Sequence, residues 1–244
     1  MSDNTPIGDR MKRYERAYQH YLPRRSYTVM RLDGRAFHTY LRGAEKPFDM
    51  TFISEMNVMT QWLCVDVQGA QFAYVQSDEI SILLTDFATT QTEPWVGGRV
   101  DKMVSLAAGG ASAYLSRLRQ NHPGLPTFDC RVFPLSDPVE VANYFIWRQK
   151  DAVRNSIQMV GQTYFSPKEL HGKSTDEVQD MLFKEKGVNW NDTDPGCKRG
   201  RVVVRDDVEG WSTMAAPHFV AEPGTFLARS IPRLPTLTDE KEEA

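Results

Sequence analysis

The sequence of 244 residues predicts an α+β fold built on a ferredoxin-like sheet. Two observations predict it. Segments rich in β-branched and aromatic residues alternate with segments of helical periodicity, and two of the apolar segments are separated by only four residues. These segments give the order β-α-β-β-α-β over residues 26–133, which forms an antiparallel sheet with two helices on one face and the first and third strands side by side at its centre.

The first strand and the first helix of this unit follow from residue type and spacing. Residues 26–32 (SYTVMRL) are β-branched and aromatic in character and lead into Asp33-Gly34, so we expect a strand that ends in a turn. After a loop, residues 52–67 have apolar side chains at helical spacing and predict a helix.

The central hairpin is predicted by the shortness of its link. Residues 71–75 (QFAYV) and 80–84 (ISILL) are two apolar segments, and only residues 76–79 (QSDE) separate them. So short a link predicts antiparallel pairing with an acidic pair at the tip.

Three further segments complete the unit. Residues 100–118 are rich in Ala and Leu at helical spacing, and residues 128–133 (FDCRVF) predict a strand that Pro134 closes. Before the first strand, residues 8–21 place Met11, Tyr14 and Tyr18 on one helical face between basic residues, so we expect an amphipathic helix that ends at Leu22-Pro23.

The last third of the chain predicts an appended α+β region. We expect helices over residues 138–160 and 174–186, the second opened by a Ser174/Glu177 capping box, and a strand over residues 201–205. The expected division is a domain over residues 1–135 that includes the N-terminal helix, an appended region over 136–232 that completes the site and supplies oligomer contacts, and a mobile acidic tail over 233–244.

Composition limits the class of protein more than it identifies it. The net charge of −3 gives no sign of a polyanionic partner for the whole chain. Cys64, Cys130 and Cys197 form no C-x-x-C pair, which disfavours a structural zinc site and a disulfide framework. No secretory leader or membrane-spanning segment is evident, so we expect a cytoplasmic protein without membrane contact.

Two acidic residues carry the chemistry that the sequence predicts. Asp33 ends the first strand and Asp78 lies at the hairpin tip, so the expected topology brings both to one edge of the sheet. Oxygen ligands of this kind suit Mg²⁺, and two such ions can activate an attacking oxygen and neutralise a pyrophosphate leaving group. Gly34 lets the backbone approach an ion closely. The alternative is that both acids are ordinary turn residues, because Asp-Gly is a common turn dipeptide.

Basic residues are interleaved with this acidic pair and are candidate phosphate ligands. The alternative is that most of them are solvated surface charges. His38 is a candidate phosphate donor, and Trp147 and Trp190 are candidate base-stacking residues, although large aromatic residues more often pack in a core. The basic candidates are Arg35, Lys46, Arg131, Arg148, Arg154, Lys198, Arg199, Arg201 and Arg205.

Four motifs in order resemble the tRNA-His guanylyltransferase family. They are residues 31–38 (RLDGRAFH), 76–79 (QSDE), 147–149 (WRQ) and 198–200 (KRG). The resemblance extends from about residue 9 to residue 205. It implies a palm-like catalytic domain akin to polymerases and nucleotidyl cyclases, and the addition of nucleotides to the 5′ end of tRNA, in the 3′-to-5′ direction, after activation of that end with ATP or GTP.

The resemblance also implies roles for individual residues. Asp33, the Gly34 carbonyl and Asp78 would hold two Mg²⁺ ions, with Asp33 and Asp78 as the catalytic residues. The nucleotide would meet Gly34, Arg35, Ala36, Phe37, His38, Lys46, Ser77 and Asp78. RNA or phosphate would meet Arg131, Arg148, Arg154, Asn155, Asn189, Lys198 and Arg199. The implied partners are tRNA and nucleoside triphosphates, and the implied assembly is a homotetramer.

Two positions depart from the eukaryotic members of the family. Val153 stands where they have a histidine, and Val178 stands where they have a lysine in the following helix. These departures resemble the guanylyltransferase-like branch, which implies template-dependent repair of 5′-truncated tRNA rather than obligate addition of one guanylate to tRNA-His.

Two other functions use the same predicted fold. A nucleotidyl cyclase would direct a 3′-hydroxyl within one nucleotide from the same paired acids. A non-catalytic RNA-binding module would stack bases on the sheet, but the sequence has no aromatic-rich RNA-recognition string, and such a module has no need of paired Asp33 and Asp78.

Overall fold

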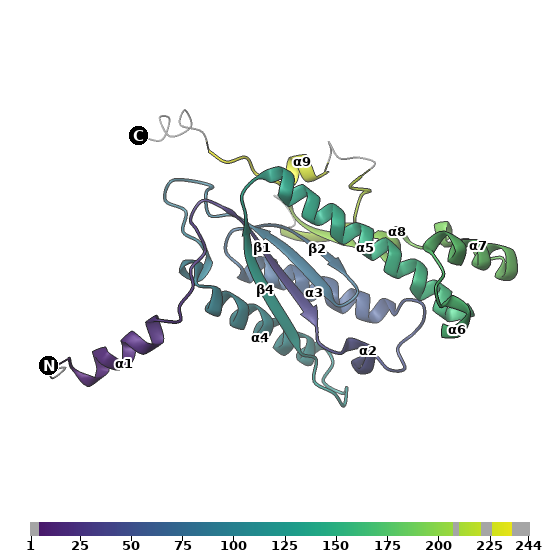
Figure 1. The fold of residues 1–244 in the computed structure, drawn as a ribbon, viewed down its shortest axis with the longest axis horizontal. Coiled ribbons are helices and arrows are strands. Elements are labelled where there is room, and N and C mark those ends of the chain that lie inside the picture. The colour runs from purple at the N-terminus through teal and green to yellow at the C-terminus, as the bar shows by residue number, and fades with distance from the viewer. Residues whose placement is uncertain (1–4, 207–209, 221–225, 236–244) are drawn as a thin grey trace.

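The computed structural model describes residues 5–206, 210–220 and 226–235. Its elements follow one another along the chain as Figure 1 shows. They are α1 (Ile7–Arg16), β1 (Tyr27–Gly34), α2 (Phe37–Tyr40), α3 (Met50–Asp66), β2 (Ala70–Gln76), β3 (Glu79–Leu84), η1 (Trp95–Gly98), α4 (Val100–Leu118), β4 (Phe128–Leu135), α5 (Pro138–Tyr164), α6 (Pro167–Leu170), α7 (Thr175–Lys186), η2 (Trp190–Asp192), α8 (Pro195–Arg199), β5 (Arg201–Asp206), β6 (Gly210–Ala215) and α9 (Phe226–Ser230).

A six-stranded antiparallel sheet forms the centre of the molecule, in the order β4-β1-β3-β2-β5-β6. The first four strands in this order are the predicted ferredoxin-like sheet, with β1 beside β3 at its centre. The α+β prediction is therefore confirmed. The appended region adds β5 and β6 to the edge of β2, so the later third of the chain extends the same sheet.

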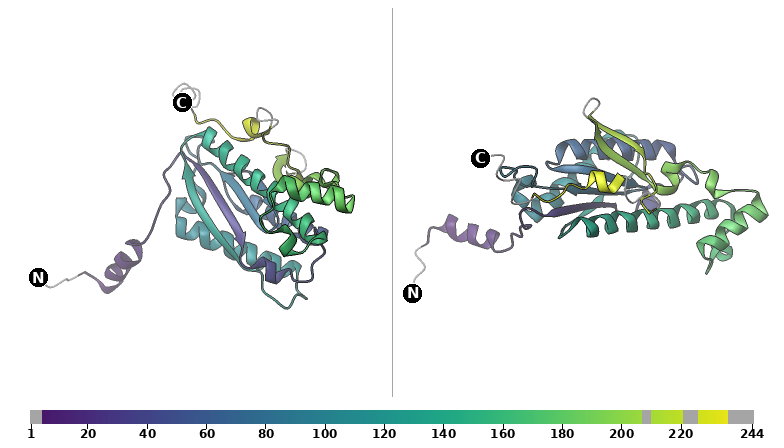
Figure 2. Two further views of the ribbon diagram at one scale, coloured as in Figure 1. Left: turned by 45° about the vertical axis from the view of Figure 1, so that its right-hand side comes forward. Right: turned by 90° about the horizontal axis from the view of Figure 1, so that it is seen from above.

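Helices cover both faces of the sheet (Figure 1 and Figure 2). α3 and α4 pack on one face, where Met56, Leu63 and Ala111 bury against strand residues such as Leu32 and Ile82. α5 crosses the other face, where Val141 and Phe145 bury against Phe72 and Leu83. The alternation of side chains along each strand feeds both cores, since successive residues point to opposite faces.

The far half of α5 carries a third core away from the sheet. Ile157 and Val160 of α5 pack against Leu170, Val178 and Leu182, which holds α7 beside α5. The predicted capping box at Ser174 and Glu177 is present.

The N-terminal helix is shorter than predicted. It ends at Arg16, and none of its residues is buried. Residues after it pair instead with the segment before α4, because Tyr21 forms a β-bridge with Arg99 and the Val100 amide donates to the His20 carbonyl. α1 therefore projects from the body of the protein in Figure 1.

Several elements have no counterpart in the predicted pattern. α2 lies in a segment that the sequence predicts as turn and loop, and β6 lies where no strand was expected. α2 has only four residues, and β6 is placed by long-range contacts, namely its pairing with β5 and the hydrogen bond from Gln61 of α3 to Thr213. The predicted tail over residues 233–244 lies largely outside the described residues.

Two further features of the described residues bear on the class of protein. None of their helices has the length and apolar character that a membrane span requires. Cys64, Cys130 and Cys197 are free and buried.

Candidate functional site

The ends of β1 and of the β2-β3 hairpin meet at one edge of the sheet. Asp33 pairs in register with Glu79, and the Gly34 amide donates to the Asp78 carbonyl at 3.1 Å. The turn places Ser77 at a φ of 50°. The structure thus brings Asp33 and Asp78 together at the edge that the sequence predicts.

The Asp78 carboxylate is held in a setting that favours a cation. Burial raises its pKa, and the charge of Asp33 raises it further, while the Ser77 side chain lowers it. A carboxylate that is desolvated and close to a second carboxylate gains most from a bound positive ion.

The backbone at Gly34 lies close to Phe37 and to the Asp78 carboxylate, which leaves no room for a side chain. A Cβ atom at this position would lie 2.7 Å from Asp78 Oδ2 and 2.5 Å from Phe37 Cδ2. No group of three or more His, Cys, Asp or Glu side chains that would enclose a metal occurs in the described residues. The two carboxylates of Asp33 and Asp78 are hard oxygen ligands of the kind that Mg²⁺ takes, and this ion keeps water ligands and completes its shell with phosphate oxygens.

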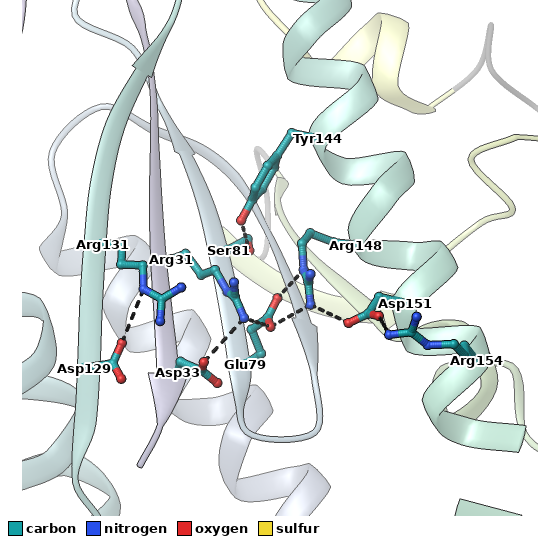
Figure 3. Close-up of polar contacts among 10 residues, drawn as sticks. All are labelled: Arg31, Asp33, Glu79, Ser81, Asp129, Arg131, Tyr144, Arg148, Asp151 and Arg154. Atoms are coloured by element: carbon teal, nitrogen blue, oxygen red, sulfur yellow. Dashed lines mark hydrogen bonds and ion pairs between the residues drawn. The ribbon is translucent and has the colours of Figure 1, made fainter. Parts of the chain in front are cut away.

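A network of ion pairs lies beside Asp33, on the face of the sheet that α5 crosses (Figure 3). Arg31 Nη2 lies 3.4 Å from Asp33 Oδ2 and 2.5 Å from Glu79 Oε2. Arg148 holds both oxygens of Glu79, at 2.6 Å and 2.7 Å, and also contacts Asp151. Burial raises the pKa of Glu79, and the charges of Arg148 and Arg31 oppose this rise without cancelling it. The network holds Glu79, the first residue of β3 and the neighbour of Asp78, against α5.

Removing Arg148 is expected to destabilise the protein strongly. In Arg148→Ala, Glu79 keeps only Arg31 in a buried setting, and breaking a buried pair costs about 3 kcal/mol. Arg154→Ala is the matched control, because Arg154 shares Asp151 but its side chain is 65% exposed, so its loss changes stability by less than about 0.5 kcal/mol. Urea unfolding measures the stability of both variants. Equal losses of stability in Arg148→Ala and Arg154→Ala would contradict a structural role for the buried Arg148 ion pairs.

A pocket of roughly 370 Å³ opens beside the acidic pair. Asp78 and Ser77 form one part of its wall, and α2, the loop before α3 and the start of α3 form another. α5 and the segment around α8 close it from the appended region. Its lining residues are Phe37, His38, Leu41, Ala44, Glu45, Lys46, Pro47, Phe48, Asp49, Phe52, Ile53, Gln76, Ser77, Asp78, Met159, Gln162, Cys197 and Arg201.

The predicted nucleotide-binding residues gather around this pocket. Phe37, His38, Lys46, Ser77 and Asp78 line it directly. The remaining three, in the turn between β1 and α2, are not among its lining residues: they are Gly34, Arg35 and Ala36.

The predicted RNA-binding residues divide into exposed and interior groups. Arg131, Arg154 and Asn155 are exposed. Arg148 is 6% exposed and occupied by Glu79, and Lys198 is 8% exposed and donates to the Asn191 carbonyl at 2.5 Å. Of the last two, Asn189 caps η2 through its side chain, and Arg199 Nε is buried without a hydrogen-bond partner.

The pocket also contains residues that the sequence did not assign to it. Met159, Gln162 and Cys197 come from the appended region, and Asp49 caps α3 by accepting from the Phe52 amide. Arg201 was grouped only with other basic residues. No spacing pattern connects them to the acidic pair, because the tertiary packing of α5 and α8 brings them there.

Comparison with known proteins agrees with this arrangement. The family model described as tRNAHis guanylyltransferase matches residues 8–136, more than half of the chain. The tRNA(His) guanylyltransferase of Debaryomyces hansenii is 29% identical over 218 residues, which are 80% of this chain and 79% of that protein.

Solved structures give the same result. A bacterial tRNA(His) guanylyltransferase-like protein in complex with ATP is 40% identical, with a TM-score of 0.86 over 91% of this chain and 98% of that chain. One in complex with GTP is 37% identical, with a TM-score of 0.81 over 92% and 98%. The chain therefore belongs to the tRNA(His) guanylyltransferase family, a family of nucleotidyltransferases.

Proposed function

We propose that this protein is a template-dependent nucleotidyltransferase that adds nucleotides to the 5′ end of tRNA, in the 3′-to-5′ direction. The observation that carries the proposal is that Asp33 and Asp78 lie together at one edge of the sheet, beside a pocket of nucleotide size that Asp78 lines. Relatives that share the fold are tRNA(His) guanylyltransferases, and bacterial members bind ATP and GTP.

Asp33, the Gly34 carbonyl and Asp78 are the residues that would hold two Mg²⁺ ions. Bound there, the ions would activate the attacking oxygen and neutralise the pyrophosphate that leaves. Arg31 forms an ion pair with Asp33, and this contact helps to orient the Asp33 carboxylate. The partly buried setting of Asp78 strengthens its attraction for a cation.

The pocket would hold the nucleoside triphosphate with its phosphates toward Asp78. His38, Lys46 and Ser77 line the pocket and are placed to donate to phosphate oxygens, whereas the Arg35 amide already donates to the Thr127 carbonyl at 2.8 Å. Phe37, Phe52 and Ile53 give the pocket apolar surface for the base.

The tRNA would approach over the exposed side of β4 and α5. Arg131 and Arg154 have side chains that are 61% and 65% exposed, and Asn155 is exposed next to Arg154. Trp147 is 53% exposed and presents an aromatic face to an unpaired base. Because Arg148 and Lys198 are occupied inside the protein, we assign them to positioning Glu79 and the η2-α8 segment.

Val153 and Val178 favour repair of truncated tRNA over obligate addition of one guanylate. Val178 is fully buried in the α5-α7 core, and Val153 packs against the edge of that core. Neither can donate a proton or pair with a phosphate, so the recognition that a histidine and a lysine would provide is lost at these positions.

A homotetramer is proposed as the assembly. α1 has ten residues, none of them buried, and Tyr14 on α1 and Tyr18 just after it are exposed. Because an isolated helix of this length is marginal in water, we expect a neighbouring subunit to cover it. Light scattering measures the mass of the assembly.

The test is nucleotide addition to a 5′-truncated tRNA. A transcript that lacks its first nucleotide, with a labelled 3′ end, is incubated with Mg²⁺, ATP and each nucleoside triphosphate in turn. We expect extension by the nucleotide that pairs with the opposite base, loss of extension with EDTA, and little addition to an intact tRNA. Untemplated addition of guanylate alone, or a cyclic nucleotide formed without RNA, would contradict the proposal.

A further inference from the structure

Arg201, the first residue of β5, has the surroundings of an anion-binding residue. Only 6% of it is exposed, and it lines the pocket beside Asp78. Its Nε donates to Asn57 Oδ1 at 2.7 Å and its Nη1 donates to the Gly196 carbonyl at 3.1 Å, whereas Nη2 is buried and has no hydrogen-bond partner among the residues that the structure describes. Both acceptors are neutral, so they orient the guanidinium without offsetting its charge.

Arg201 has no ion-pair partner within the part of the chain that the structure describes, and the carboxylate of Asp194 acts on its charge only from beyond ion-pair distance. No carboxylate there lies within ion-pair distance of it, although the other strongly buried arginine, Arg148, has two. Burial lowers the pKa of Arg201, which reflects the same cost. A buried cation of this kind is stabilised most by a bound anion, and a guanidinium matches phosphate oxygens in shape and charge.

The position of Arg201 identifies which anion would arrive. Arg201 pairs in register with Val75, three residues before Asp78, and both Arg201 and Asp78 line the same pocket. We propose that Arg201 binds a phosphate group inside this pocket, from the nucleoside triphosphate or from the 5′-phosphate of the RNA. The inference rests on the proposed function for the identity of these two ligands.

Binding measurements on the full chain test it without turnover. In Arg201→Met, which keeps the aliphatic part of the side chain, we expect GTP to bind about tenfold more weakly in Mg²⁺, while guanosine, which has no phosphate, binds as in the wild type. Arg201→Lys keeps the charge, and its affinity for GTP is expected to lie between those of the wild type and Arg201→Met. Arg205→Met is the matched control, because Arg205 is exposed on the same strand.

A second pair of ligands distinguishes the two phosphate sources. A short RNA hairpin with a 5′-phosphate is compared with the same hairpin carrying a 5′-hydroxyl. If Arg201→Met removes the preference for the 5′-phosphate and leaves GTP affinity unchanged, the RNA end is the ligand. If neither GTP affinity nor this preference changes, or if GTP and guanosine weaken equally, the inference is wrong.

Thermal unfolding guards against a purely structural role for Arg201. Inorganic tripolyphosphate is expected to raise the melting temperature of the wild type more than that of Arg201→Met. Without phosphate, Arg201→Met is expected to be at least as stable as the wild type, since it removes a buried charge that has no ion-pair partner among the described residues. A large loss of stability together with an unchanged tripolyphosphate effect would overturn the inference. Phosphate binding through Arg201 without extension of any tRNA would instead refute only the proposed function.

Discussion

Replacing Asp78 with alanine is expected to abolish nucleotide addition while leaving the fold intact. Asp78 is one of two carboxylates at the proposed Mg²⁺ site, and burial disfavours its charge, which raises its pKa, in the ligand-free protein. Metal-assisted charge stabilisation is worth several kcal/mol, so a loss of about 4 kcal/mol corresponds to roughly a thousandfold lower rate.

The stability of this variant should move in the opposite direction to its activity. A carboxyl group whose pKa is raised on folding opposes folding when it is ionised, so its removal does not destabilise the ligand-free protein near neutral pH. Tm measured without Mg²⁺ should therefore equal or exceed that of the wild type, and the rise in Tm caused by Mg²⁺ and GTP together should shrink.

Single-turnover extension of a truncated tRNA measures the effect on activity. Asp180→Ala is the matched control, because Asp180 is an acidic residue of α7 whose side chain is 68% exposed and pairs only with Lys184. It should retain wild-type rates. Turnover in a folded Asp78→Ala protein at more than a few per cent of the wild-type rate would remove Asp78 from the metal site.

Most of the fold could be predicted because its signals are local. The two-residue turn at Ser77 and Asp78 allows only an antiparallel hairpin, and the α4 boundaries follow directly from Ala and Leu at helical spacing. The N-terminal helix was predicted too long because helical periodicity continues to Tyr21, whereas the tertiary pairing of Tyr21 with Arg99 decides its conformation. Long-range pairing also creates β6, which sequence pattern alone did not predict.

The residues of the candidate site divide in the same way, into those whose place follows from the predicted strand order and those whose place depends on tertiary packing. Asp33, Gly34 and Asp78 could be predicted because strand order alone brings the ends of β1 and the hairpin together. Charge pattern could not separate Arg154, which is exposed, from Arg148, which Glu79 and Asp151 occupy. An arginine on an amphipathic helix has the same sequence signature in both settings, and only the packing of α5 on the sheet distinguishes them.

Gly34→Ala is expected to be nearly as damaging to activity as loss of Asp78. The added Cβ would lie 2.5 Å and 2.7 Å from two atoms of the Phe37 ring and 2.7 Å from Asp78 Oδ2. The packing of the Phe37 ring against Phe52 and Phe128 resists its displacement. We therefore expect the Asp78 carboxylate or the turn to move.

A small movement is sufficient, because Mg²⁺ requires near-ideal octahedral geometry and a misplacement of about 1 Å costs on the order of a hundredfold in rate. Gly109→Ala is the matched control: a Cβ at Gly109, inside α4, meets nothing within 4 Å and should preserve activity. Titrating Mg²⁺ separates the possible causes. The metal ligands remain in Gly34→Ala but are displaced, so this variant should need more Mg²⁺ for half-maximal activity and should stay slow at saturating Mg²⁺. Wild-type activity at saturating Mg²⁺ would show that Gly34 does not set the metal geometry.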